Sequence, residues 1–386
     1  MKSWLTLFFT FLVFAACTPS NATVDLPVAL PSSHFPTLDD LWEGRAAFRV
    51  DVQDTGLPMG ESDTVVVDGQ FRSYLHASKR SAGVVDQCGD PVEFPGCVVI
   101  LQSPDKGRSF QPLKENSQGQ PVCQIPCLSC PCDSKRDQID QQQYPRVAHS
   151  ADAGWLMVYE YRANTMLRRS PDGLQWSPAE EVPLTGIWQQ WLMPCAAYER
   201  VGDHPFAARS YDCLIGGPPG ISLLSQNFFV FVGMGQNPGH LGCLVGNVNA
   251  PASLMRKCLA NPLFSGASDY GPLQQSNVAA NPFFDFRTIS SADTLQVGTH
   301  LYLFYEGVRG PTRNAPGDTQ FALGLARSVG SEFDGPWQTY PGNPLLVDLP
   351  GNIGVGHADV VVYEGKTYLY TSLDGKVRSR LVLVWR

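Results

Sequence analysis

Cysteine is the residue type whose number and spacing most directly indicate chemistry in this sequence. The chain has 11 cysteines, and four of them lie between Cys123 and Cys132 in the pattern C-x3-C-x2-C-x-C. Four thiolates are a suitable ligand set for zinc. However, prolines interrupt this cluster and no CxxC pair recurs at the spacing of a zinc ribbon. We therefore favour disulfides here, with zinc as the alternative.

The N-terminal residues predict export and a lipid anchor. Lys2 is followed by an apolar run from Trp4 to Ala16, which is too short to span a bilayer comfortably and ends in small residues, as signal peptides do. The run ends in Phe14-Ala-Ala-Cys17, which is similar to a bacterial lipobox except that Phe14 stands where Leu is usual. We expect a signal peptide at residues 1–16, lipidation of Cys17 and a flexible tether over residues 17–43. The protein would then be anchored at the bacterial cell envelope; secretion after ordinary cleavage is the alternative.

Export to an oxidising compartment makes disulfides the default state of the other cysteines. If Cys17 carries lipid, an even number remains. Close spacing predicts three pairs, which are Cys88 with Cys97, Cys195 with Cys213, and Cys243 with Cys258. The partners of the four clustered cysteines stay open.

Composition argues for a β protein and against a nucleic-acid partner. The 386 residues include 31 Pro and 36 Gly, which disfavour long helices. Only 17% of residues are charged and the net charge is −8, so clustered cations for a phosphate backbone are lacking. From about Gly44 onward, short β-type runs recur as a loose module. Its five copies begin near Asp63, Tyr144, Met193, Phe284 and Gly356.

Five copies of a β module predict an all-β, five-bladed β-propeller over residues 44–386, without a second domain. The last copy lacks an outer strand, which Arg45–Val52 could supply, although an independent strand is equally consistent. Ser103–Phe110 matches the Asp-box of sialidase-like propellers, and Ser170–Trp176 is a shortened relative. In such turns Asp accepts backbone N–H groups and Gly takes a positive φ, so they indicate structure rather than catalysis.

The chain resembles the five-bladed β-propeller glycoside hydrolases, a superfamily that includes arabinanases, β-xylosidases, levansucrases and invertases. The resemblance covers roughly Gly44 to Arg386 and rests on GHADVVVYEGKTYLYTS from Gly356, LYLFYEG around Glu306, and ARSVGSEFDGPW with the following NPLL. It implies hydrolysis of an extracytoplasmic carbohydrate by a protonated carboxylic acid and an ionised carboxylate. It implies no cofactor, although some members hold an axial ion, and calcium is the candidate here.

In that superfamily the pocket lies on the axis, where innermost strands begin and second strands end. The resemblance therefore predicts that Glu61 or Asp63 faces this pocket, with Asp63 as base or nucleophile and Glu160 or Glu306 as the acid. Asp63 could instead pair with an arginine, and His357 could be an ordinary hydrogen-bonded core residue. The residues expected to bind substrate are Arg146, Asp285, Arg287, His357, Asp359 and Trp191.

The family pattern is broken in two places. The start of blade two usually carries an Asp, where this chain has Tyr144-Pro-Arg146, and the start of blade three carries the acidic Glu, where we align Met193-Pro-Cys195. Either the acid has moved to another strand, or the protein is a surface lipoprotein that binds a carbohydrate or a partner without cutting it. A sialidase-like hydrolase of anionic sugars, with Arg146 and Arg287 as clamps, is the third interpretation.

Overall fold

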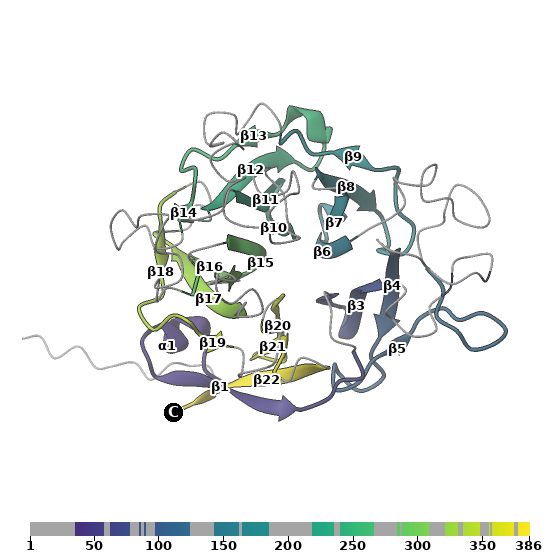
Figure 1. The fold of residues 1–386 in the computed structure, drawn as a ribbon, viewed down its shortest axis with the longest axis horizontal. Helices are drawn as coiled ribbons and strands as arrows, with labels where there is room; N and C mark the ends of the chain where they lie inside the picture. The colour runs from purple at the N-terminus through teal and green to yellow at the C-terminus, as the bar shows by residue number, and fades with distance from the viewer. Residues whose placement is uncertain are drawn as a thin grey trace, which may run out of the picture. The chain divides into compact units, whose positions relative to one another are not determined.

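Figure 1 shows five antiparallel β-sheets around a central axis in a computed structural model of the protein. The structure describes residues 35–57, 62–77, 85, 89, 97–123, 143–161, 164–184, 218–234, 240–265, 284–285, 288–308, 321–330, 335–347, 355, 357–373 and 377–386. The first strand of each sheet contacts the first strands of its neighbours, so each sheet is a propeller blade. The predicted all-β class and five-bladed β-propeller are confirmed.

The blades use consecutive strands of the chain, numbered outward from the axis. Blade one contains β2 (Ser62–Val67), β3 (Gln70–Ala77), β4 (Cys97–Gln102) and β5 (Gln111–Pro112). Blade two contains β6 (Gln143–Ser150), β7 (Gly154–Tyr161), β8 (Asn164–Ser170) and β9 (Glu180–Glu181). Blade three contains β10 (Gly220–Leu224), β11 (Asn227–Met234), β12 (His240–Asn247), β13 (Arg256–Lys257) and β14 (Phe264–Ser265), with the 3-10 helix η4 (Ala252–Leu254) before β13.

The last two blades complete the ring. Blade four contains β15 (Thr288–Val297), β16 (His300–Val308), β17 (Phe321–Ser328), β18 (Trp337–Thr339) and β19 (Leu346–Val347). Blade five contains β20 (Asp359–Tyr363), β21 (Lys366–Ser372), β22 (Arg378–Trp385) and β1 (Ala46–Val52). The pairing of β1 with β22, from Ala46 opposite Trp385 to Val52 opposite Arg380, settles the role of Arg45–Val52: this segment closes the ring.

Tight hairpins set the register of the inner strands. Asp68 and Gly69 have φ values of 51° and 75°, and Glu364 and Gly365 have 49° and 78°, as two-residue turns between twisted strands require. Register then fixes which residues share an end of the blade. Glu160 pairs with Gln143 at the start of β6, and Glu306 pairs with Ser290 near the start of β15. Both glutamates therefore lie at the end where the inner strands begin, as expected.

Apolar side chains between the blades form the core. Five clusters of buried residues each fill the space between two neighbouring blades; Leu156 and Val158 of blade two, for example, share a cluster with Val230 and Leu244 of blade three. Helix α1 (Leu38–Trp42) packs Leu38 and Leu41 into the cluster between blades four and five. The compact unit therefore begins at Phe35, ahead of the expected Gly44.

The two Asp-containing turns also tie blades together. Asp105 accepts the N–H groups of Arg108 and Ser109, and Gly107 has a φ of 80°. The hydroxyl of Tyr370, on blade five, donates to the carbonyl of Gly107 at 2.8 Å. A Cβ at Gly107 would lie 2.2 Å from that hydroxyl, so the close approach requires glycine. Similarly, Tyr74 of blade one donates to the carbonyl of Gly173 in blade two at 2.9 Å.

The expectations about the disulfide pairs, the zinc site and the N-terminal segment have different outcomes. The pair Cys243–Cys258 is present, whereas Cys97 bonds to Cys123 rather than to Cys88. Because Cys123 is in a disulfide, the four-thiolate zinc site is wrong. Cys195, Cys213 and the other clustered cysteines lie outside the described residues, as do residues 1–34 with the predicted signal peptide and Cys17. No helix among the described residues is long and apolar enough to cross a membrane.

Candidate functional site

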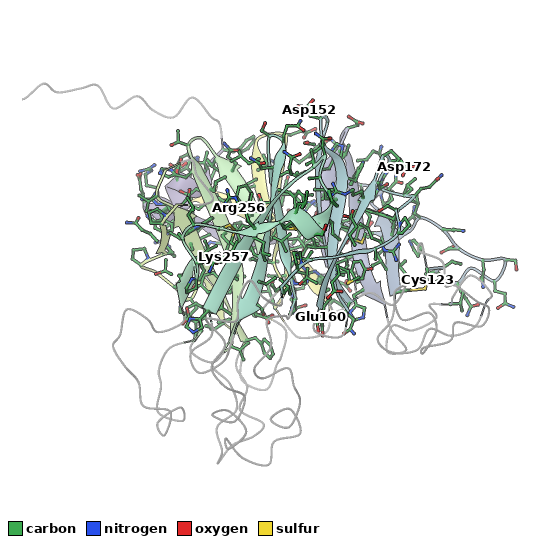
Figure 2. All side chains as sticks on the ribbon, turned by 90° about the horizontal axis from the view of Figure 1, so that it is seen from above. Cys123, Asp152, Glu160, Asp172, Arg256 and Lys257 are labelled. Atoms are coloured by element: carbon green, nitrogen blue, oxygen red, sulfur yellow. A yellow bond between two sulfur atoms is a disulfide. The ribbon has the colours of Figure 1, made fainter. Side chains whose placement is uncertain are left out.

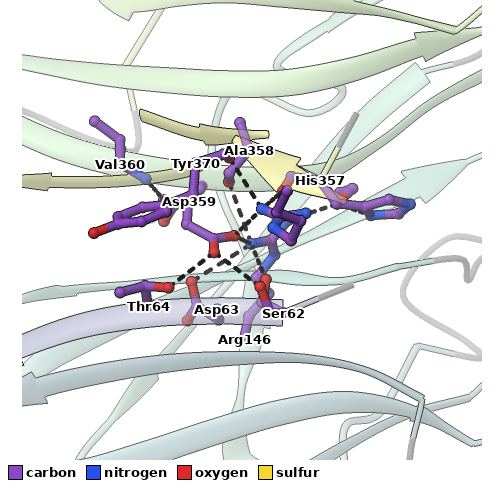
Figure 3. Close-up of polar contacts among 12 residues, drawn as sticks. Ser62, Asp63, Thr64, Arg146, His357, Ala358, Asp359, Val360 and Tyr370 are labelled. Carbon is purple, nitrogen blue, oxygen red and sulfur yellow. Dashed lines mark hydrogen bonds and ion pairs between the residues drawn. The ribbon is translucent and has the colours of Figure 1, made fainter. Parts of the chain in front are cut away.

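Polar side chains from the inner strands of three other blades converge on Arg146 of blade two. Figure 3 labels those of blades one and five. The guanidinium is 3% exposed. Nη1 donates to Asp359 Oδ1 at 2.9 Å and lies 3.4 Å from Asp63 Oδ1, and Nη2 donates to Ser291 Oγ at 2.7 Å. The carbonyl oxygens of Ser62 and Ala358 accept from the same Nη1, each at 3.2 Å. Arg146 is thus a fully engaged cation at the centre of the ring.

Asp63 is also buried, and its carboxyl accepts the backbone N–H of Val147 on the next blade. Burial raises the pKa of Asp63 well above 3.8, and the charges of Asp293 and Asp359 raise it further, while Arg146 opposes them. A carboxylate whose pKa moves toward neutrality is a better general base than an ordinary Asp. The sequence allowed two roles for Asp63, as a base or nucleophile and as the ion-pair partner of an arginine. Its contact with Arg146 shows the second role, which does not exclude the first.

Asp359 is held by hydrogen bonds and ion pairs on all sides. Its Oδ2 accepts from Ser62 Oγ and Thr64 Oγ1, both at 3.1 Å. Its Oδ1 faces Arg146 and lies 3.0 Å from Nη2 of Arg378, which is 1% exposed. Because these groups use the acceptor capacity of the carboxylate, we assign Asp359 to building the site rather than to binding sugar.

Asp293 is a site residue that sequence reasoning missed. The register of β15 shifts between Ser290 and Asp293, and this bulge places the carboxyl where Oδ2 accepts the N–H of Val360 at 2.6 Å. Burial raises the pKa of Asp293 from 3.8 to about 7, against the opposing charge of Arg146. The polar run Ser-Ser-Ala-Asp inside an otherwise apolar strand is the signal that could have found it.

A cavity of about 320 Å³ lies on the axis next to Asp63 and Asp293. It is lined by the later residues of all five inner strands, among them Val65–Val67, Val147–His149, Ile221–Leu223, Asp293–Gln296 and Val360–Val362. The cavity extends from the charged cluster toward the hairpin turns.

Glu306, His357 and Ser291 form a second group beside Arg146. Ser291 Oγ lies 2.6 Å from Nδ1 of His357, and Nε2 of His357 lies 3.2 Å from Oε2 of Glu306. Ser290 Oγ is 3.5 Å from Oε1 of Glu306, a long hydrogen bond. Glu160 is 8% exposed and lies on the face opposite the turn at Asp152 (Figure 2). Glu306 is thus linked to the central cluster through His357 and Ser291.

Backbone strain accumulates at the same end of the blades. Tyr144, Ser291 and His357 have φ values of 56°, 50° and 45°, in the left-handed region that non-glycine residues rarely adopt. The Tyr144 ring stacks on the His357 ring at 5.9 Å between centroids, with 1° between their planes. Such strain, where other contacts enforce it, is characteristic of functional sites.

Blade three differs from the other blades in the residues at the start of its innermost strand. Its innermost strand is β10, so placing this strand at Met193–Cys195 is wrong: strand order is decided by pairing, and β10 pairs with β11. In the described residues the start of blade three is Pro218-Pro219-Gly220, without an acidic side chain. A Cβ at Gly220 would lie 2.2 Å from the carbonyl oxygen of Ala292, so no side chain fits there. Among the described residues, the start of this strand therefore offers no acidic side chain.

Several predicted residues do not reach the cluster or cannot be placed. Asp285 is buried and accepts a hydrogen bond from the Tyr305 hydroxyl at 3.2 Å. Glu61, Trp191, Pro194, Cys195 and Arg287 lie outside the described residues. Within the described part of the chain, no group of three or more His, Cys, Asp or Glu side chains is placed to hold a metal ion.

Comparison with solved structures identifies the fold. A candidate glycoside hydrolase from Parabacteroides distasonis matches with a TM-score of 0.53 and 13% identity, over 87% of this chain and 96% of that one. A glycosyl hydrolase from Bacteroides ovatus matches with a TM-score of 0.52 and 14% identity, over 86% and 85%. The chain shares the five-bladed propeller fold of glycoside hydrolases. No protein-family model matches the sequence, and no curated protein matches it.

Proposed function

We propose that this protein is a glycoside hydrolase-like propeller that acts on an extracytoplasmic carbohydrate at the Arg146 end of its axis. The observation that carries the proposal is that one buried arginine contacts Asp63 directly and is linked through Ser291 to the Glu306–His357 pair, within a fold that glycoside hydrolases use. The N-terminal sequence supports export and a lipid anchor at Cys17, which would place the site outside the cytoplasm.

Glycoside hydrolysis gives each carboxyl a role. Glu306, when protonated, transfers its proton to the glycosidic oxygen as the C–O bond breaks and the electron pair moves to that oxygen. Asp63, when ionised, takes a proton from the attacking water or attacks the anomeric carbon itself. Water supplies the hydroxyl and the proton that appear in the products. If Asp63 acts as base, its new proton returns to Glu306 through solvent; if Asp63 attacks the sugar, Glu306 takes a proton from the water that hydrolyses the ester, and both carboxyls are restored. Arg146 and Val147 hold Asp63 in place.

The test is turnover of a panel of aryl glycosides by the wild type and by Glu306→Gln and Asp63→Asn. Loss of an acid or base should lower kcat at least about 100-fold. The loss in Glu306→Gln should be smaller for aglycones that leave without protonation. Glu181→Gln, at an exposed position on β9, is the matched control and should keep full activity.

A non-catalytic carbohydrate-binding lipoprotein is the second candidate. The observation that favours it is the start of blade three, where Gly220 leaves no space for the usual acid. Binding to a glycan array without turnover of any aryl glycoside would support this candidate, whereas unchanged kcat in both carboxyl variants would remove Asp63 and Glu306 from the mechanism.

A further inference from the structure

Four side chains are connected in series next to the axis, three from strands β6, β15 and β16 and the fourth, His357, from the segment just before β20. Arg146 Nη2 donates to Ser291 Oγ at 2.7 Å, Ser291 Oγ lies 2.6 Å from His357 Nδ1, and His357 Nε2 lies 3.2 Å from Glu306 Oε2. Arg146, Ser291 and Glu306 are 3%, 1% and 4% exposed. The series therefore runs through a region from which water is largely excluded.

The guanidinium of Arg146, at one end of the series, sets the direction in which the hydrogen bonds are donated. A guanidinium can only donate, so Ser291 Oγ must accept from Arg146, which leaves the serine hydrogen free to point at His357 Nδ1. A neutral imidazole that accepts at Nδ1 carries its proton on Nε2, facing the Glu306 carboxylate. The opposite tautomer would place a bare ring nitrogen against a carboxylate oxygen. Arg146 thus selects the Nε2–H tautomer of His357 through Ser291.

The same serine also accommodates a protonated ring. Its oxygen has two lone pairs and its hydrogen rotates, so it can accept from both Arg146 and an Nδ1–H group. A doubly protonated His357 would then keep its place, with Nε2–H still directed at Glu306. The backbone of Ser291 and of His357, with φ values of 50° and 45°, holds both groups in this arrangement.

We propose that His357 is a positioning residue that controls the proton on Glu306, with Ser291 and Arg146 fixing its ring. This inference rests on the proposed function of Glu306 as the acid. In the active form the pair holds two protons. One is on Nε2 of His357 and the other is on Glu306. When Glu306 gives its proton to the leaving oxygen, the Nε2–H group donates a hydrogen bond to the carboxylate that forms, and solvent then returns a proton to Glu306.

Other ionisable groups contact the pair or the residues that hold it. Nη2 of Arg378 donates to the carbonyl of His357 at 2.6 Å and also pairs with Asp359. The Tyr144 ring stacks on the His357 ring, and the His76 ring lies edge-on to Tyr144. Arg146, which donates to Ser291, pairs with Asp63 and Asp359, and Asp293 lies on the same strand as Ser291. Glu306 is the carboxylate in ion-pair distance of the His357 ring.

The kinetic test is the pH dependence of kcat and kcat/KM for His357→Gln, in which an amide can still contact Ser291 and Glu306 but cannot ionise. A proton shared with an imidazole is lost at higher pH than one held by a carboxyl alone, so the alkaline limb should move to lower pH by at least about one unit. The value of kcat should fall about tenfold or more, with KM within about twofold.

His300→Gln, at the other end of the strand that carries Glu306, is the matched control and should keep the wild-type profile. The proposal would be overturned if the pH profile of His357→Gln kept the wild-type alkaline limb, or if the substitution changed KM without lowering kcat.

A second measurement separates this inference from the proposed function. In the full chain labelled with ¹⁵N-histidine, neutral His357 should carry its proton on Nε2, and Ser291→Ala should mix the two tautomers. Glu306→Gln should lower the titration midpoint of His357 by about one pH unit or more. A neutral ring protonated on Nδ1, or a midpoint that Glu306→Gln does not move, would overturn the inference even if the enzyme is active. If no glycoside is turned over but these signals are found, the proposed hydrolase function fails while the His357–Glu306 coupling stands.

Discussion

The axial cluster and the turn between β8 and β9 hold the same residue type in opposite states. At the axial cluster, burial raises the pKa of Asp293 to about 7 and that of Asp63 well above 3.8. At the turn, the N–H groups of Gln175 and Leu174 hold the pKa of Asp172 below 3.8, against the effect of burial. The turn carboxylate serves structure by staying ionised, whereas the axial Asp293 can hold a proton near neutral pH.

The two regions also differ in how far apart in the sequence their contacts lie. Asp105 is bonded by Ser109, four residues away, and Asp172 by Gln175, three residues away. Arg146 reaches Ser291 and Asp359, which are 145 and 213 residues away. The turns can therefore form from local sequence, while the axial cluster exists only when the ring is assembled.

Arg146→Met should have the largest effect on stability. It leaves the buried Asp63 and Asp359 carboxylates without their central cation, and removing one partner of a buried ion pair costs about 3–5 kcal/mol. Denaturant titration at pH 7.5 would measure the loss. A loss below about 1 kcal/mol would mean that the axial cluster is no more than an exposed surface network.

Asp293→Asn should change how stability depends on pH. The folded-state pKa of Asp293 is raised, so its contribution to stability is fully present below about pH 4 and is lost as pH rises to about 7. The wild type should lose up to about 1.4 kcal/mol per pH unit from this group in that range, and Asp293→Asn should have a shallower slope. Asp172→Asn is the contrast, because a lowered pKa adds stability that disappears only on acidification below about pH 4. Equal slopes in the wild type and Asp293→Asn would contradict the assignment.

Lys106→Met, in the turn region, should have the smallest effect. Its Nζ lies 2.9 Å from Oε1 of Glu364, but the two side chains are 64% and 61% exposed. Exposed ion pairs contribute about 0–1 kcal/mol, so the midpoint of unfolding should barely move. High salt screens the pair and should make this shift smaller still. A loss comparable to that of Arg146→Met would erase the distinction between the two regions.

Much of the axial cluster could be predicted because it depends on where strands begin. Repeats of the β module placed Asp63, Arg146, His357 and Asp359 at inner-strand starts, and the structure brings these four together. The paired Glu306 followed from the same periodicity, since a return strand ends beside the start of its partner. Pattern and register placed these residues at one end of the blades, and the family resemblance implied that this end holds the site.

Other features depend on information that no local pattern contains. Asp293 and Ser291 reach the axis because of a bulge in β15, whose position depends on packing between blades. The start of blade three was misplaced because MPCAAYERV has strand-like composition, while the pairing of β10 with β11 selects GISLL instead. The partner of Cys97 was wrong for a related reason: sequence separation favours Cys88, but the fold brings Cys123 to the end of β4.

The closure of the ring by β1 and β22 has a consequence for the order in which this chain can mature. β1 is synthesised before any complete blade, and its hydrogen-bonding partner is the last strand to be made. The edge of β1 therefore waits unpaired while the other blades emerge, and contacts between such distant segments form slowly. The axial cluster, which includes Arg378 of β22, is therefore completed only after Arg378–Trp385 has been made.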